Sequence, residues 1–400
     1  MPDEAFLPYG RHTIEADDIG AVVDVLSGEY LTTGPAVEAL EAAFCEATGA
    51  PHSVACSSGA AGLHLSYLAL GLGRGDKVVV PSVTFLATAS MAHLAGAEVI
   101  FADVDPDTAL MTEDTFEAAI WRAGGNVAAV VPVHMCGQMV DMDAIGLIAQ
   151  NSGIRIVEDA CHALGGRDAK DCPTGQGSTS DLTMFSLHPV KTVAGGEGGV
   201  VTTADPDLAA RMRTLRNHGM MRDRFLDATQ ATAADGAENP WYYELAEPAF
   251  NYRLSDIHAA LATSQMSKLE RFVVRRAELR ARYEGLFAER ASVFNGRVRL
   301  APSTAKGRTS WHLCVALFEF EVIGKDRAYV MRALRELGIG TQVHYLPLHR
   351  QPWWRQRNGN TYLPGADSWY ARCLSLPLFP GMRDEDVDRV VDAITALVRF

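Results

Sequence analysis

The chain has 400 residues, of which 48% are hydrophobic and 21% charged, and its formal net charge is -13. That length can bury a large core and suggests one large domain followed by a smaller one. Binding to a phosphate backbone needs clustered positive charge, and the sequence has no dense block of lysine or arginine, so we expect no nucleic-acid partner. A small anionic ligand can still bind locally at a helix N-terminus.

No uninterrupted apolar stretch is long enough to cross a bilayer, and residues 1–9 lack the basic and apolar regions of a signal peptide. We therefore expect a cytoplasmic protein with no membrane partner. The seven cysteines are scattered along the chain without a CxxC pair. Such a set is typical of free thiols in a reducing compartment, and it predicts neither a disulfide framework nor a metal site.

From about residue 34 onward, helical periodicity alternates with short β-branched runs. The expected helices are 35–48, 60–70, 86–95 and 141–151, and the expected strands are 52–56, 77–81, 98–102, 127–133 and 155–157. Alternation of this kind predicts an α/β fold with a largely parallel sheet and helices on both faces. Ligands on such sheets bind beyond the carboxyl ends of the strands.

The second half of the sequence has a different pattern. Residues 221–249 are rich in Ala, Asp and Gly and have no clear period, which predicts a long loop. Ser255 is a plausible N-cap for a long helix that leads out of the large domain. After Arg297 the pattern becomes mixed α+β and closes with a helix over 384–398. We therefore expect a large domain over 1–254 and a smaller one over 255–400.

The most informative stretch is 184–199, in which Lys191 follows a strand and precedes a Gly-Gly-Glu-Gly-Gly turn. Four glycines in five residues indicate positive φ angles or the close approach of a ligand. Burial would lower the pKa of Lys191 and make it nucleophilic enough for a Schiff base. The alternative is an ordinary solvated lysine, and this context alone does not decide between them.

A second cluster, 157–162, directly follows a strand and contains Glu158, Asp159 and His162. A carboxylate there points into the crevice where ligands bind, and a cofactor with a pyridine ring needs one to keep its nitrogen protonated. Either carboxylate could take this role, because strand parity does not settle which one faces the crevice, or Asp159 could simply cap a turn. His162 could bind a cofactor oxygen or cap a turn.

Two further strand ends carry candidate ligand contacts. The small-residue turn at 57–60 leads into a helix whose first N–H groups, together with serine hydroxyls, could bind a phosphate. Small residues at a helix start also occur for packing reasons. In the stretch 84–88, Phe85 could stack on a planar ring, or it could belong to the core.

Taken together and in this order, these stretches resemble the pyridoxal-phosphate (PLP) sugar aminotransferases of the DegT/StrS type, which have the aspartate-aminotransferase fold, fold type I of PLP enzymes. The resemblance covers nearly the whole chain. The matching segments are 30–35, 57–60, 81–88, 158–162, 186–191 and 250–256.

The resemblance implies a role for each matching residue. Lys191 would bind PLP covalently and move protons, Asp159 would pair with the pyridine nitrogen, and His162 would approach the ring hydroxyl. Phe85 would stack on the ring. The phosphate would be bound by Ser58, Gly59, Ala60 and Ser186. Asn251 would reach the phosphate in the neighbouring subunit of a homodimer with shared active sites, and Arg253 would contact substrate there.

A narrower resemblance, over 8–11, 131–138, 241–244 and 338–352, is to the UDP-4-amino-4,6-dideoxy-N-acetyl-β-L-altrosamine transaminases of pseudaminic acid synthesis. It implies amination of C4 of a UDP-linked 4-keto-6-deoxy-N-acetylhexosamine, with L-glutamate as the amino donor. The residues that would contact this nucleotide-sugar are Thr33, His188, Arg253, His344, Tyr345 and His349.

The chain departs from the family pattern at Ala60, where a threonine is usual, so one hydroxyl of the phosphate site is missing. Three alternatives remain. Another NDP-3-keto or 4-keto-6-deoxysugar could be the substrate, or the enzyme could act on an amino acid, or the protein could bind PLP without catalysis. Relatives that carry out 3-dehydration have histidine in place of the lysine, and Lys191 argues against that reaction.

Overall fold

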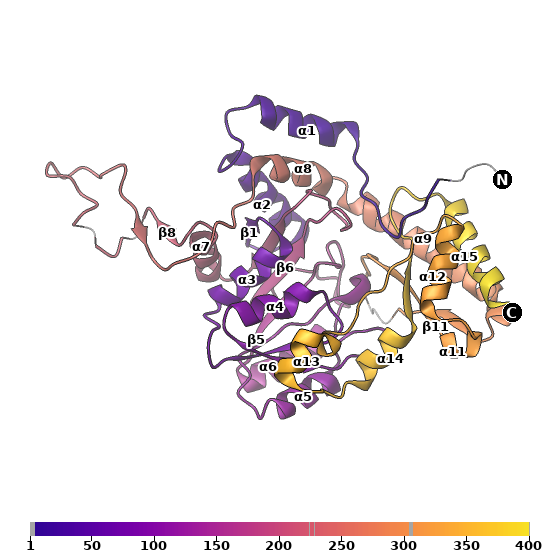
Figure 1. Cartoon of the computed structure of the whole chain (residues 1–400). Coiled ribbons are helices and arrows are strands. Elements are labelled where there is room, and N and C mark those ends of the chain that lie inside the picture. The colour runs from indigo at the N-terminus through magenta and orange to yellow at the C-terminus, as the bar shows by residue number, and fades with distance from the viewer. Residues whose placement is uncertain (1–4, 224, 228, 304–306, 400) are drawn as a thin grey trace.

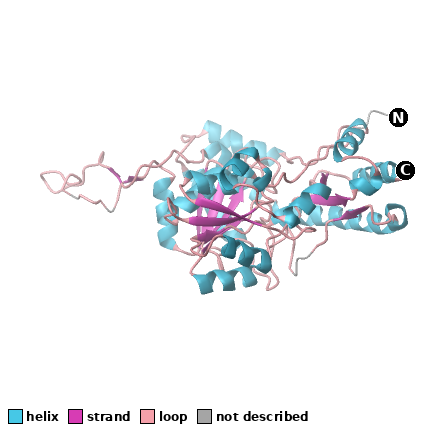
Figure 2. Ribbon diagram, turned by 60° about the horizontal axis from the view of Figure 1, so that its bottom comes forward, coloured by secondary structure: helices cyan, strands magenta, loops and turns pink. Residues whose placement is uncertain are grey.

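The computed structural model describes residues 5–223, 225–227, 229–303 and 307–399. A seven-stranded sheet in the order β1–β7–β6–β5–β4–β2–β3 lies at the centre, between layers of helices (Figure 2). All neighbouring strands pair in parallel except β7, which is antiparallel to β1 and β6. The expected α/β fold is confirmed. The strands are β1 (His52–Cys56), β2 (Lys77–Pro81), β3 (Glu98–Ala102), β4 (Ala129–Val130), β5 (Arg155–Asp159), β6 (Leu182–Ser186) and β7 (Gly199–Thr203).

The helices that surround this sheet come mainly from the first part of the chain (Figure 1). They are α1 (Ala16–Ser27), α2 (Pro35–Thr48), α3 (Gly59–Ala69), α4 (Leu86–Leu94), α5 (Glu113–Arg122), α6 (Met142–Ser152), α7 (Pro206–Leu215) and α8 (Asp256–Met266). The four helices and five strands expected from periodicity are present. Strand β4 is shorter than expected because Pro132 has no N–H to donate to the ladder.

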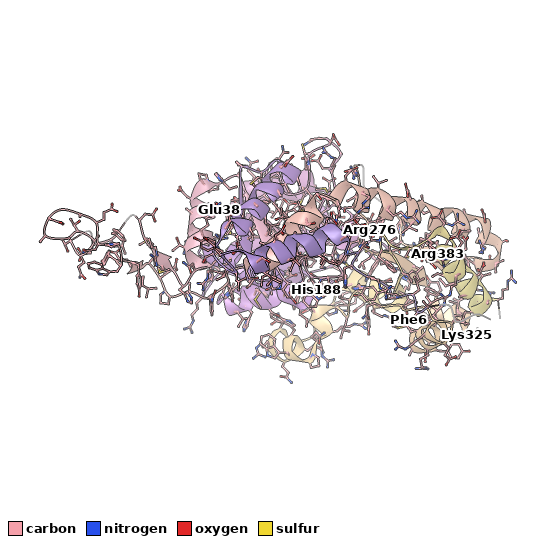
Figure 3. All side chains as sticks on the ribbon, turned by 90° about the horizontal axis from the view of Figure 1, so that it is seen from above. Phe6, Glu38, His188, Arg276, Lys325 and Arg383 are labelled. Atoms are coloured by element: carbon pink, nitrogen blue, oxygen red, sulfur yellow. The ribbon has the colours of Figure 1, made fainter. Side chains whose placement is uncertain are left out.

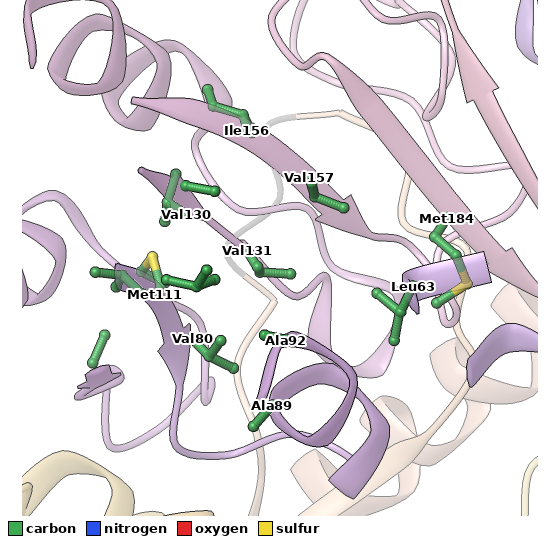
Figure 4. Packing of buried hydrophobic residues seen from close by; sticks show 14 of the residues in the cluster. Leu63, Val80, Ala89, Ala92, Met111, Val130, Val131, Ile156, Val157 and Met184 are labelled. Carbon is green, nitrogen blue, oxygen red and sulfur yellow. The ribbon is translucent and has the colours of Figure 1, made fainter. Parts of the chain in front are cut away.

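The strands are apolar along most of their length because both faces of the sheet are covered. Strand β7 is buried throughout, and β2 and β5 are buried at every position but the first. Figure 4 shows the resulting packing, with Val80 of β2 near Ala89 of α4 and Met184 of β6 near Leu63 of α3. The core therefore fixes where each strand ends.

The C-terminal part is built on a smaller antiparallel sheet, β10 (Val298–Leu300), β11 (Cys314–Phe318) and β12 (Cys373–Leu376). Its helices are α9 (Leu269–Glu289), α10 (Ala291–Phe294), α11 (Phe320–Ile323), α12 (Arg327–Glu336), α13 (Pro352–Asn358), α14 (Pro364–Arg372) and α15 (Asp384–Val398), and short 3₁₀ turns are η1 (Met135–Gly137) and η2 (Leu348–Arg350). A second apolar core lies between this sheet and α9, α12 and α15. Leu348, Trp354 and Trp369, however, pack in the core of the large sheet. The division at residue 254 stays a prediction.

The described residues of the long loop expected over 221–249, which are 221–223, 225–227 and 229–249, project away from the body of the molecule (Figure 1). At its base, β8 (Met220–Met221) pairs antiparallel with β9 (Glu244–Leu245). Among the described residues, no helix is both long and apolar enough to cross a membrane. All seven cysteines are free thiols.

The long helix expected from Ser255 begins there, since the Ser255 hydroxyl accepts a hydrogen bond from His258 N, but it is broken before Leu269. Lys268, at the break, is 7% exposed, and its ammonium group contacts three carboxylates that precede or begin α1. The distances from Nζ are 3.4 Å to Glu15, 2.7 Å to Asp17 and 2.8 Å to Asp18. This charge cluster holds α1 along α8 (Figure 1).

Asp18 is the buried member of the cluster, with a side chain that is 0% exposed. Burial alone raises the pKa of its carboxyl, but hydrogen bonds from Lys268, Ser264 and Gln265 outweigh burial, and the net pKa lies below the ordinary value. A carboxylate with a depressed pKa stabilises the fold above its unfolded pKa, and this contribution is lost as the pH falls.

We expect Asp18→Asn to lower the free energy of unfolding by about 2 kcal/mol at neutral pH, because an amide would turn its NH₂ toward the donors that now bind a carboxylate. Urea unfolding monitored by circular dichroism measures this. The difference from the wild type should shrink as the pH falls. Asp17→Asn, at a side chain 60% exposed, is the matched control and should have little effect. Equal losses in the two variants would contradict this account.

Candidate active site

A cavity of about 640 Å³ lies where the carboxyl ends of β1, β2, β5 and β6 meet, and the C-terminal part of the chain closes one side of it. Parallel strands end at the same edge of a sheet, so these segments, distant in sequence, converge there. The sequence-predicted residues that line the cavity are Ser58, Gly59, Ala60, Phe85, Asp159, His162, Ser186, His188, Lys191, His344 and Tyr345.

Lys191 lies in the turn that follows β6, where its main-chain N–H donates to His188 O at 2.8 Å. Burial lowers the pKa of its ammonium group, and the nearby Asp159 carboxylate offsets this only in part. The glycine turn after it has a geometric reason. Gly196 has a φ of 82°, and a Cβ on Gly199 would lie 2.5 Å from Ser58 O.

The structure shows which of the two adjacent carboxylates, Glu158 or Asp159, faces the cavity, a question that the alternation of side chains along the strand left open. Asp159 lines the cavity, whereas Glu158 lines a second one and binds His134, with Glu158 Oε2 2.6 Å from His134 Nε2. His134 Nδ1 accepts a hydrogen bond from Val140 N–H, so Nε2 carries the proton and donates it to Glu158. The carboxylate of Glu158 is therefore taken up by hydrogen bonds within the protein, and Asp159 is the carboxylate available to a ligand.

Both oxygens of Asp159 are held by neighbours. Oδ2 accepts from the Thr88 hydroxyl at 2.8 Å, and Oδ1 accepts from Cys161 N–H at 3.2 Å. The Thr88 and Thr84 hydroxyls lie 2.8 Å apart, and Thr88 is completely buried. The two threonines thus fix the carboxylate in one orientation. Sequence reasoning included them in the stretch 84–88 but gave them no role.

His162 is buried and has an aromatic environment. Its Nε2 lies 3.3 Å from the Tyr345 hydroxyl, while its Nδ1 has no hydrogen-bond partner among the described residues. Phe85, 58% exposed, lies at the mouth, with its ring centroid 6.2 Å from that of Tyr345. On the same side of the cavity, His344 Nδ1 is 2.7 Å from Ser375 Oγ.

Four predicted contacts are not among the cavity-lining residues. Thr33 and Asn251 are exposed, and Arg253 Nη1 binds Asn217 Oδ1 at 2.6 Å. His349 is buried, 2.7 Å from Ser82 Oγ and 3.2 Å from Asp367 Oδ1. The cavity also includes residues that sequence analysis did not assign to the site, notably Tyr9, Glu197, His312, Gln342 and Gln351. Tyr9 lies in a segment noted only for its resemblance, and the sequence around His312 offered no signal.

Residues 12–395 match the DegT/DnrJ/EryC1/StrS aminotransferase family. The chain belongs to this family. It is a PLP-dependent sugar aminotransferase, with the fold of the structures it resembles.

Solved structures resemble the whole chain. Helicobacter pylori PseC, an aminotransferase involved in the biosynthesis of pseudoaminic acid, is 24% identical with a TM-score of 0.88, over 98% of this chain and 99% of that one. Spr1654 from Streptococcus pneumoniae in its PLP form is 27% identical with a TM-score of 0.86, over 98% of each chain. DesI in the presence of its TDP-sugar product is 28% identical with a TM-score of 0.85, over 99% of this chain and 94% of that one.

The cavity residues fit PLP. At the start of α3, Ser58 caps the helix by accepting from Ala61 N at 3.1 Å, and a Cβ on Gly59 would lie 3.1 Å from Ser186 Oγ. Two serine side chains and the first helical N–H groups therefore face one small space, which suits a phosphate. Asp159 and the unpartnered Nδ1 of His162 suit the ring of the same molecule.

We expect Thr88→Val to lower kcat about tenfold, the equivalent of about 1.4 kcal/mol, because Asp159 would lose a donor that fixes its carboxylate. Valine keeps the shape of threonine, so the cavity should be preserved. Steady-state kinetics measures kcat, and the melting temperature checks the fold. Thr84→Val, one hydroxyl farther from Asp159, should have a smaller effect. A Thr88→Val enzyme with normal kcat would mean that the hydroxyl does not orient Asp159.

Proposed function

We propose that this aminotransferase transfers the amino group of L-glutamate to C4 of a UDP-linked 4-keto-6-deoxy-N-acetylhexosamine, as in pseudaminic acid synthesis. Support comes from the four sequence segments that resemble that subgroup and from the full-length likeness to PseC. The alternative within the same class is another NDP-3-keto or 4-keto-6-deoxysugar, since DesI was solved with a TDP-sugar.

The observation that carries the choice of a sugar is the composition of the cavity wall. Lys191 is the only lysine or arginine among the described lining residues, whereas four imidazoles and two phenols line the space, from His162, His188, His312, His344, Tyr9 and Tyr345. Hydroxyl and acetamido groups pair well with such neutral donors and acceptors. The wall contributed by one chain therefore suits the hydroxyl and acetamido groups of a keto-sugar.

When bound, PLP supplies the electron sink that makes the reacting carbon acidic. We propose that Lys191 anchors the cofactor and then moves the proton at that carbon, a role suited to an amine whose pKa burial has lowered. Asp159, fixed by Thr88, would keep a proton on the ring nitrogen. Phe85, at the cavity mouth, would pack against the ring and exclude water. With these groups intact, we do not favour a non-catalytic PLP-binding role.

The first experiment is the visible absorbance of the purified PLP-loaded protein. We expect glutamate to bleach the band of the lysine-bound cofactor and the UDP-4-keto-6-deoxy-N-acetylhexosamine to restore it. Lys191→Ala should bind PLP without sustaining turnover. A band that glutamate leaves unchanged would overturn the choice of donor. Restoration only by a dTDP-keto-sugar, or by a 2-oxo acid without any nucleotide, would select one of the alternatives.

We further propose a cytoplasmic homodimer with shared active sites. Asn251 and Arg253 lie outside the cavity of their own chain, and an arginine from a second copy would supply the cation that glutamate needs. Exposed apolar side chains support an interface, including Phe85 and Leu86 at the cavity mouth and three residues of α1, Ile19, Val23 and Leu26. Free thiols are typical of a reducing compartment.

Mixing two inactive variants tests the shared site. Lys191→Ala and Arg253→Ala should each be inactive, whereas refolding or co-expressing them together should restore about a quarter of wild-type activity. The reason is that half of the dimers would be mixed, each with one of its two sites intact. Affinity tags on each variant confirm exchange, and light scattering gives the mass. No recovery in proven mixed dimers would mean that both residues serve the same chain's site.

A further inference from the structure

His312 forms part of the cavity wall, yet it has no hydrogen-bond partner at Nδ1 among the described residues. Its ring packs on that of His162, with centroids 4.3 Å apart and planes inclined by 33°. Both side chains are about 95% buried. The two imidazoles therefore pack as a pair in one wall of the cavity, with the His312 ring lying against the ring of His162.

The position of His312 is set by its main chain. Its N–H donates to Cys136 O at 3.0 Å, and its carbonyl accepts from Arg276 Nη1 at 3.3 Å. Arg276, labelled in Figure 3 on the long helix α9, is 1% exposed and also donates to Leu378 O at 2.8 Å. The ring of His312 is thus held in place from the C-terminal part of the chain, while His162 follows β5 of the large sheet.

The surroundings keep both rings uncharged. Burial is the main cause that lowers the pKa of each imidazole far below its ordinary value, and Lys191 would lower it further when protonated. Arg276 faces His312 from α9, and His344 faces both rings from the segment before η2. The phenol of Tyr345, whose pKa burial raises, is neutral as well. A neutral imidazole presents one N–H and one lone pair.

Tyr345 lies beside Nε2 of His162, so Nδ1 is the nitrogen of His162 that has no partner within the described part of the chain. The way in which His162 can bind a ligand depends on two properties of its ring. One is which nitrogen carries the proton, and the other is the orientation of the ring plane. The His312 ring covers one face of His162 and so limits both its tilt and the access of water.

We propose that His312 is a positioning residue, whose ring keeps water from His162 and holds it in one orientation against the PLP ring. His312 acts through His162 and does not itself contact the reacting atoms. The inference rests on the proposed contact between His162 and PLP, but it does not depend on which sugar is the substrate.

The test is a double-mutant cycle on PLP binding to the apoenzyme, measured by equilibrium dialysis, with His312→Ala, His162→Ala and the double variant. We expect His312→Ala to weaken PLP binding about tenfold, the size of one lost hydrogen bond. The double variant should bind PLP no more weakly than His162→Ala alone, because the second residue acts through the first. His312→Phe keeps a ring of similar shape and should bind PLP nearly as the wild type does.

A second readout is the pH dependence of the visible band of the loaded enzyme. In His312→Ala, water reaches His162 and its pKa returns toward the ordinary range, so a new titration should appear near neutral pH that the wild type and His312→Phe lack. The exposed His12→Ala is the matched control, and melting temperatures exclude unfolding.

Three outcomes would overturn the proposal. Additive losses would show that His312 contacts the ligand itself. A Phe variant as impaired as the Ala variant would show that the imidazole nitrogens matter, not the packing of the ring. If His162→Ala binds PLP normally, the proposed contact of His162 fails, which is distinguishable from a failure at His312 alone.

Discussion

Parallel strands must end at the same edge of a sheet, and in this protein that requirement assembles the site. The segments after β1, β2, β5 and β6 each supply one part of it: Ser58 and the start of α3, Phe85, Asp159, and Lys191. Because the strands are buried on both faces, the core fixes their register and therefore where each segment leaves the sheet. The positions of the reactive groups thus depend on apolar packing between the strands and helices of the core, away from the cavity itself.

Alternation along β5 gives two adjacent carboxylates different roles. Glu158 turns to one side, where His134, Ser180 and Thr183 donate to it. These hydrogen bonds outweigh burial, so the pKa of Glu158 stays below its usual value and the group remains an anion. Asp159 turns to the other side, where Thr88 and Cys161 N–H are the donors to its carboxylate among the described residues. One carboxylate stabilises the strand end, and the other keeps lone pairs for a ligand.

The fold could be predicted from sequence wherever the signal was local. Hydrophobic periodicity predicted the bounds of α2 and β1–β3 almost to the residue. The glycine-rich sequence after Lys191 predicted a turn there. Features set by distant contacts could not be predicted in this way. The break between α8 and α9 occurs at Lys268, which turns toward carboxylates some 250 positions away in the chain. The role of Thr88 depends on its meeting Asp159, and that of His312 on its meeting His162, and neither contact has a signal in the local pattern.

The wall of the cavity that comes from the C-terminal part of the chain completes the electrostatics of the site. His312 and His344 reach it from segments anchored by Arg276 and Ser375, respectively, and Tyr9 reaches it from the N-terminal arm. These groups exclude water without adding a fixed charge.

The same burial lowers the pKa of Lys191, which favours a free amine, and keeps His162 and His312 neutral. A further carboxylate in this wall would change both conditions at once, since a neighbouring anion would stabilise the protonated forms of the lysine and of the imidazoles alike. The scarcity of carboxylates among the described lining residues therefore meets one requirement, since the site needs a nucleophilic lysine and uncharged imidazoles in the same small volume.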